Sequence, residues 1–139
     1  MFNRLIQPNI IYLPAIDRIL KDYFSLLKIS HKTFWKKLDI DSVRKIFLLS
    51  LRDFYQKKIT PEELSAIALR LYYNDKSWTP FDVDSKDSEL GTVLGYAEEI
   101  SYYRYRYKKS KNKEDKKSYD SFLRKINDYY NRNRHFLEV

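Results

Sequence analysis

Apolar residues recur through most of this chain at the three- and four-residue spacing of an amphipathic helix. The first such face follows Pro14, a residue whose fixed φ suits the first turn of a helix. The pattern predicts a helix from Pro14, preceded by an N-terminal arm over residues 1–13, where Pro8 interrupts any helix. The apolar positions of the helix are Ile16, Ile19, Leu20, Tyr23, Phe24 and Leu27.

A second apolar pattern, over residues 43–55, covers much of the circumference of a helix. This predicts a central helix that is buried on most sides, with Asp39 or Asp41 as its N-cap. Ser30 is suited to cap a short helical segment before it. The apolar residues of the short segment are Phe34, Trp35 and Leu38, and those of the central helix are Val43, Ile46, Phe47, Leu49, Leu51, Phe54 and Tyr55.

The clearest helix start in the chain lies at residues 60–63. Thr60 offers a side-chain oxygen as N-cap, Pro61 fits the first turn, and Glu63 completes a capping box. We therefore predict a third long helix from this point. Its apolar stripe consists of Leu64, Ile67, Ala68, Leu71 and Tyr72.

A fourth long helix is predicted after residue 87, with Asp87 or Ser88 as its cap and an end near Tyr107. Gly91 and Gly95 stand four residues apart within it, which indicates a close crossing with another helix. Its apolar stripe consists of Leu90, Val93, Leu94, Ala97, Ile100 and Tyr103.

The C-terminal region is predicted to contain a flexible lysine-rich connector at residues 108–117 and a last helix from about Ser118 that frays near His135. Residues 74–86 are predicted to form a loop. With only two glycines and four prolines in 139 residues, the chain has too few turn residues for a sandwich or barrel. We expect one all-α domain over residues 1–139, a compact bundle of four to five helices.

The composition removes several classes of protein. Without cysteine the chain has no disulfide framework, thiol nucleophile or thiolate metal site. It also lacks an apolar run long enough to span a bilayer and the features of a signal peptide, so we expect a cytoplasmic protein that makes no membrane contact.

Positive charge is concentrated near the C-terminus. Residues 1–101 carry 15 Lys+Arg against 14 Asp+Glu, whereas residues 102–139 carry 12 against 5, within a total net charge of +8. Such asymmetry favours an anionic partner, although a compositional bias of the genome would also raise the lysine content.

We find no catalytic constellation in the sequence. His31 and His135 lie far apart. Neither follows an arginine after four to six intervening residues, the spacing found in helical ribonucleases of the HEPN type. Asp82 and Asp84 lack the glycine and glutamate of a calcium loop. We expect a protein without enzymatic activity, cofactor or metal.

Tyrosines and cations alternate at the end of the fourth predicted helix. Stacking rings combined with cations are typical of nucleic-acid contacts. The alternative is that Tyr103 and Tyr107 face the core while the cations are simply solvated. The candidate contact residues are Arg104, Tyr105, Arg106, Lys108, Lys109 and Lys111.

The predicted loop supplies candidates for a protein contact. Trp78 and Phe81 are large apolar anchors, and Asp82 and Asp84 add negative charge. The two aromatic residues could equally fill the end of the bundle.

The segment FLLSLRDFYQKKITPEELSAIALRLYY, residues 47–73, resembles small helical bacterial immunity proteins of the colicin-like kind. Shared features are a helix, a short turn, an Ile-Thr-x-Glu-Glu helix start and a second helix that ends in an aromatic pair. The resemblance implies an immunity or antitoxin-like protein that binds another bacterial protein. A small basic nucleic-acid-binding module is the alternative.

Overall fold

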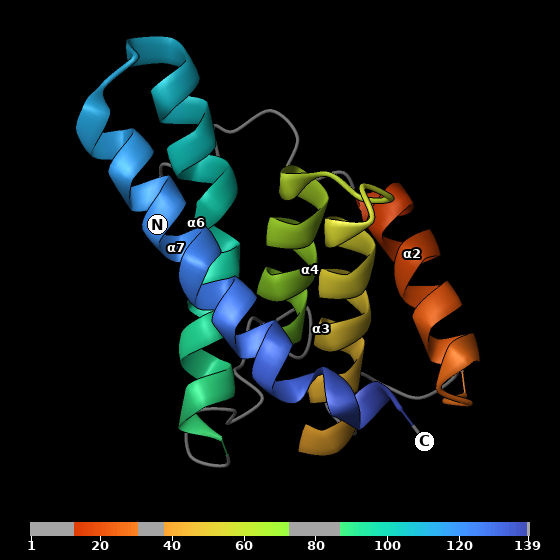
Figure 1. Ribbon diagram of the computed structural model, residues 1–139. Coiled ribbons are helices and arrows are strands. Elements are labelled where there is room, and N and C mark those ends of the chain that lie inside the picture. The colour runs from red at the N-terminus through yellow and green to blue at the C-terminus, as the bar shows by residue number, and fades with distance from the viewer. Residues whose placement is uncertain (1–12, 31–37, 73–86, 139) are drawn as a thin grey trace.

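The computed structural model describes residues 13–30, 38–72 and 87–138. These ranges form five α-helices and one short 3-10 helix (Figure 1), so the expected all-α bundle is confirmed. The elements are α2 (Leu13–Leu26), α3 (Ile40–Tyr55), α4 (Pro61–Tyr72), α6 (Ser88–Ser110), α7 (Lys113–Asn133) and η2 (Arg134–Leu137).

Several predictions fall outside the described ranges. These are the N-terminal arm apart from Leu13, which begins α2, the short segment up to residue 37, and the loop at residues 74–86. In the described part of the chain, no helix has the length and apolar character that a bilayer crossing requires.

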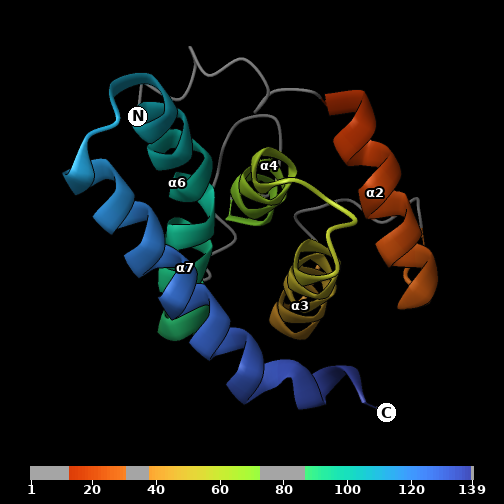
Figure 2. The same cartoon turned by 45° about the horizontal axis from the view of Figure 1, so that its top comes forward.

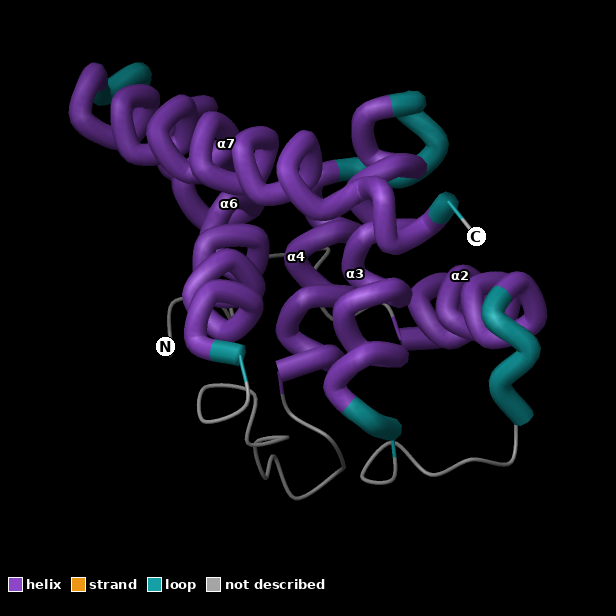
Figure 3. The backbone as a smooth tube through the Cα atoms, turned by 60° about the horizontal axis from the view of Figure 1, so that its bottom comes forward, coloured by secondary structure: helices purple, strands orange, loops and turns teal. Residues whose placement is uncertain are grey.

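The helices pack as two antiparallel hairpins with α2 at one side. α6 packs on both α7 and α4, and α3 packs on α4. Figure 3 shows α7 lying across the bundle from α6 toward α3, where η2 also makes contact. The turn that joins α6 to α7 extends beyond the end of α4 (Figure 1).

The middle of α3 is buried on most sides, as its all-round apolar pattern predicts. Seven residues of this helix between Val43 and Leu51 are buried. The apolar ones belong to one hydrophobic cluster with apolar side chains of α2, α4, α6 and α7. The largest fully buried side chains are Tyr23, Ile46, Phe47, Leu48, Leu51, Leu64, Ile67, Leu71, Leu90, Leu94, Ile100 and Tyr129.

Three of the predicted helix starts are confirmed by their caps. Asp39 accepts a hydrogen bond from the backbone N of Ser42 at 2.7 Å, and Asp87 accepts one from Leu90 at 3.1 Å. In the capping box, Thr60 N donates to Glu63 at 2.8 Å and Glu63 N donates to Thr60 Oγ1 at 3.1 Å. These bonds satisfy backbone N–H groups that the first helical turn leaves without partners.

The lysine-rich connector at residues 108–117 is wrong as a loop, because most of it is helical. α6 continues to Ser110 and α7 begins at Lys113. Lys111 takes a left-handed conformation with φ 56°, and Asn112 caps α7 by accepting from the backbone N of Glu114 at 2.8 Å. Helix caps thus shorten the connection to two residues.

At Gly95 the structure does not show the close crossing that the two glycines predict. A Cβ added to Gly95 would meet nothing within 4 Å, so no neighbour requires glycine there. Instead, Ser65 of α4 is fully buried against α6 and donates to the carbonyl of Ala97 at 2.7 Å. The same hydroxyl accepts from the backbone N of Ser101 at 3.2 Å. A serine therefore joins α4 to α6.

Candidate functional site

The outer end of the α6–α7 pair, which we call the hairpin tip (residues 105–117), concentrates exposed positive charge. It contains seven cations against two carboxylates, Glu114 and Asp115. All seven cationic side chains are exposed, and the tip extends past α4 (Figure 1), so a large ligand has access to it. The cations are Arg106, Lys108, Lys109, Lys111, Lys113, Lys116 and Lys117.

Two tyrosines of the tip are paired with lysines one helical turn further along. The ammonium group of Lys109 lies 5.8 Å from the centre of the Tyr105 ring, and Lys111 lies 5.8 Å from that of Tyr107. Both rings are half-buried. The spacing of four residues puts the Tyr105 ring and the Lys109 ammonium on the same side of α6. Lys111 caps the end of the helix beside Tyr107. The tip therefore presents aromatic surface and positive charge together.

Arg106 links α6 to α7 within the tip. Its Nε lies 3.4 Å from Asp115, a carboxylate only 5% exposed, and its Nη1 donates to the Tyr102 hydroxyl at 3.0 Å. The bond to Tyr102 and the charge of Asp115 raise the pKa of Arg106. The side chain remains half exposed, so it both holds the hairpin and faces solvent.

Arg104 contacts α4 and not the turn between α6 and α7. Its Nη1 is 2.5 Å from Glu62 in the first turn of α4, with both side chains partly buried. Tyr103 packs its ring on Phe122 of α7, with centroids 5.4 Å apart. These two residues join α6 to its neighbours, and we leave Arg104 out of the contact surface. Tyr105, Arg106, Lys108 and Lys109 lie in the last turns of α6, and Lys111 caps its end.

Two cations of the tip were missed from the sequence, because residues 108–117 were assigned to a connector. They are Lys116 and Lys117, in the first turns of α7. Lys116 pairs with Asp120 at 2.8 Å, a hydrogen bond that raises the pKa of Lys116. The signal was Asn112 followed by two acidic residues, a pattern typical of a helix start.

The proposed protein-contact residues, Trp78, Phe81, Asp82 and Asp84, lie outside the described residues. Their role stays a prediction. Of the two histidines, His135 is exposed and lies beside Phe136 with ring centroids 4.3 Å apart, whereas His31 falls in an undescribed range.

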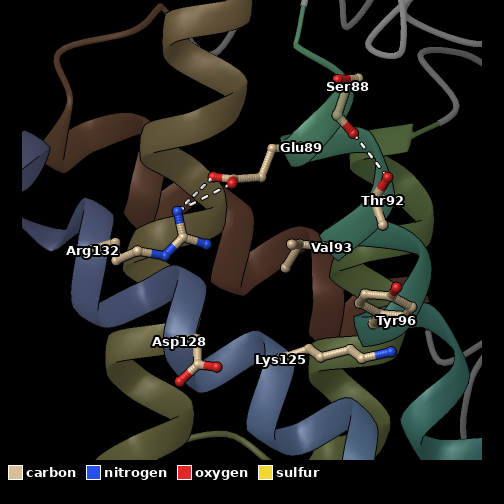
Figure 4. Close-up of a pocket in the computed structure, with 8 residues that line it drawn as sticks. All are labelled: Ser88, Glu89, Thr92, Val93, Tyr96, Lys125, Asp128 and Arg132. Carbon is tan, nitrogen blue, oxygen red and sulfur yellow. Dashed lines mark hydrogen bonds and ion pairs between the residues drawn. The ribbon is translucent and has the colours of Figure 1, made fainter.

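A shallow groove of about 360 Å³ lies between α6 and α7, away from the tip (Figure 4). Glu89 and Arg132 point toward each other there and form an ion pair at 3.1 Å. Lys125 extends toward Tyr96, with its ammonium 4.8 Å from the ring centre. Because charges of both signs offset each other, the groove favours neither anions nor cations. The lining residues are Ser88, Glu89, Thr92, Val93, Tyr96, Lys125, Asp128 and Arg132.

Over the described ranges, no three His, Asp or Glu side chains are grouped as a metal site would require. The hairpin tip is thus the best candidate for function, and its chemistry suits an anionic ligand. Comparison of this chain with protein-family models, with curated proteins and with solved structures found no match.

Proposed function

We propose that the protein is a cytoplasmic, non-catalytic module that binds nucleic acid through the hairpin tip. The observation that carries the proposal is the exposure of all seven cations of the tip around a two-residue turn. When such cations bind the phosphates of a nucleic acid, the counterions of those phosphates are released. This release drives binding without sequence preference.

The tyrosines favour single strands over duplexes. Tyr105 and Tyr107 keep part of their surface exposed beside Lys109 and Lys111. Unpaired bases stack on such rings, and each stack contributes about 1–3 kcal/mol, whereas bases in a duplex are already stacked. The cations supply the attraction to phosphate, and the rings select accessible bases.

The test is a salt titration of binding to labelled single-stranded and double-stranded 30-nucleotide probes, with anisotropy as the readout. The variant Lys108→Glu/Lys109→Glu/Lys111→Glu removes three cations of the tip. If each lysine meets a phosphate of a single strand, the slope of log affinity against log salt should fall by about 2.

A matched control carries the same charge change elsewhere. Lys21→Glu/Lys57→Glu/Lys58→Glu alters three exposed lysines, and Lys57, like Lys111, has a left-handed backbone with φ 60°. The control should keep the wild-type salt slope and most of the affinity. Equal losses in both variants would reduce the effect to net charge, and no binding by the wild type at 50 mM salt would end the proposal.

An immunity or antitoxin-like function is the second proposal, and the helix-turn-helix form of α3 and α4 supports it. Residues 47–72 do form two helices with a capped start at Thr60. Much of the apolar surface of this segment is buried in the core, so the partner would have to contact other residues. A protein partner bound through buried aromatics would stay bound at salt concentrations that release an oligonucleotide.

A further inference from the structure

A second surface, which we call the α2–η2 groove, combines exposed apolar side chains with cations. Its volume is about 280 Å³. Leu49 of α3, 4% exposed, forms the floor. In Figure 2 the C-terminal end of α2 and the C-terminal segment of the chain approach the same side of α3, and these two segments supply the walls. The wall residues are Leu26, Leu27, Phe136 and Leu137.

Leu26 is the most unusual residue of the groove. It is 61% exposed, more than any other large hydrophobic side chain in the described ranges. It stands outside the buried stripe of α2, so packing within the described chain does not cover it. A single exposed leucine is ordinary, but Leu27, Phe136 and Leu137 are also only half-buried beside it. Together they offer an apolar contact to another molecule.

Two cations of α3 line the same groove. Lys45 and Arg52 are seven residues apart, which places them on one face of α3 about 10 Å from each other. Lys45 pairs with the exposed Asp41 at 3.2 Å, and Arg52 uses its Nε to contact Asp53 at 3.3 Å. Exposed ion pairs contribute about 0–1 kcal/mol, so an incoming carboxylate competes with Asp41 at little cost.

The size and charge of the groove decide between possible occupants. A volume of about 280 Å³ is slightly below the range of about 300–1,000 Å³ typical of small-molecule pockets, and it suits one or two inserted side chains. The phosphate backbone of a nucleic acid would make no favourable contact with the four apolar side chains of the walls. A second copy of this chain, with net charge +8, would bring cations toward Lys45 and Arg52.

From this complementarity we infer that the α2–η2 groove binds an acidic segment of a partner protein. The segment inserts one or two apolar side chains between Leu26 and Phe136 and places carboxylates beside Lys45 and Arg52. Burial of apolar surface supplies most of the affinity, and the two cations select acidic over basic segments. This site is separate from the hairpin tip and does not depend on nucleic-acid binding.

The experiment is selection of a random 12-residue peptide library on the full chain, followed by anisotropy measurements with the enriched peptides. We expect a consensus that combines leucine or phenylalanine with aspartate or glutamate. Leu26→Asp should weaken these peptides by at least about tenfold, and Arg52→Gln should weaken them less. Because Leu26 is exposed, its replacement should leave the thermal unfolding of the chain unchanged, which circular dichroism checks.

A variant of the tip and an altered peptide complete the test. Lys109→Glu should bind the peptides like the wild type while it weakens oligonucleotide binding, so the two sites fail independently. Replacing the acidic residues of a peptide by lysine should abolish its binding. The inference is overturned if no consensus emerges, if the consensus is basic, or if Leu26→Asp binds the selected peptides as well as the wild type does.

Discussion

The hydroxyl of Tyr129 yields a specific prediction about stability. This side chain is 1% exposed, and its oxygen has no hydrogen-bond partner in the described structure. The guanidinium of Arg44 lies close enough to the Tyr129 oxygen to oppose the rise of its pKa, but the hydrogen bonds of Arg44 run to Asp41 and Asp87. An unsatisfied buried polar group costs about 1–3 kcal/mol of desolvation. Tyr129 therefore lowers the stability of the fold relative to phenylalanine.

Tyr129→Phe should raise the free energy of unfolding by about 1 kcal/mol, because it removes the hydroxyl and keeps the ring against Phe47, 5.9 Å between centroids. For a chain of this size that is about 3–4 °C in melting temperature. Tyr23→Phe is the matched control. Its hydroxyl donates to Asp53 at 2.9 Å, so the same chemical change there should destabilise by about 1.5–3 kcal/mol.

The assay is urea and thermal unfolding followed by circular dichroism between pH 7 and pH 11. Burial raises the pKa of Tyr129 and of Tyr23 well above the ordinary value near 10. The unfolded chain then loses protons that the folded chain keeps. The free energy of unfolding therefore does not depend on the ionisation of either tyrosine below pH 10. Above pH 10 each tyrosine lowers it by up to about 1.4 kcal/mol per pH unit.

The difference in unfolding free energy between Tyr129→Phe and the wild type should therefore grow as the pH rises past 10, since phenylalanine does not titrate. The prediction fails if Tyr129→Phe destabilises the protein as much as Tyr23→Phe does at pH 7. That result would mean that the Tyr129 hydroxyl has a hydrogen-bond partner in solution.

Three more experiments test how the helices are held. Gly95→Ala should stabilise by about 0.5–1 kcal/mol in urea unfolding, because the added Cβ meets open space within a helix, and a loss would reveal a hidden contact. Thr60→Ala breaks the capping box and should lower the unfolding free energy by about 1 kcal/mol, whereas Thr60→Ser should retain most of it. A double-mutant cycle of Glu62→Gln and Arg104→Gln should give a coupling of no more than about 1 kcal/mol that shrinks in 1 M salt, and a salt-independent coupling would contradict the ion pair.

Local chemistry made much of this fold predictable from the sequence. Three helix starts could be predicted from their caps, Asp39, Thr60 and Asp87, because a cap acts on backbone groups two or three residues away. The all-round apolar pattern of α3 identified a helix with a buried middle for a similar reason. A helix with apolar side chains on most sides must be buried, whichever helices pack around it.

The hairpin tip could be predicted only in part, because it depends on contacts between helices. Lysine-rich composition suggested a connector, but Asn112 and the acidic residues after it start a helix two residues past the end of α6. The burial of Asp115 beneath Arg106 cannot be read from composition, since it needs α6 and α7 side by side. The role of Arg104 was likewise fixed by a glutamate 42 residues earlier.

The two-residue turn between α6 and α7 also bears on how the chain reaches its fold. Helices that follow one another in the described chain pack on one another, α3 on α4, α4 on α6 and α6 on α7. Closing such short loops costs little chain entropy, and proteins dominated by local contacts fold in microseconds to milliseconds. Each hairpin can form early, and the Ser65 hydroxyl then joins them, with its bonds to the backbone of α6 made only when α4 has docked. Substitution of Ser65 would accordingly act late in folding and chiefly accelerate unfolding.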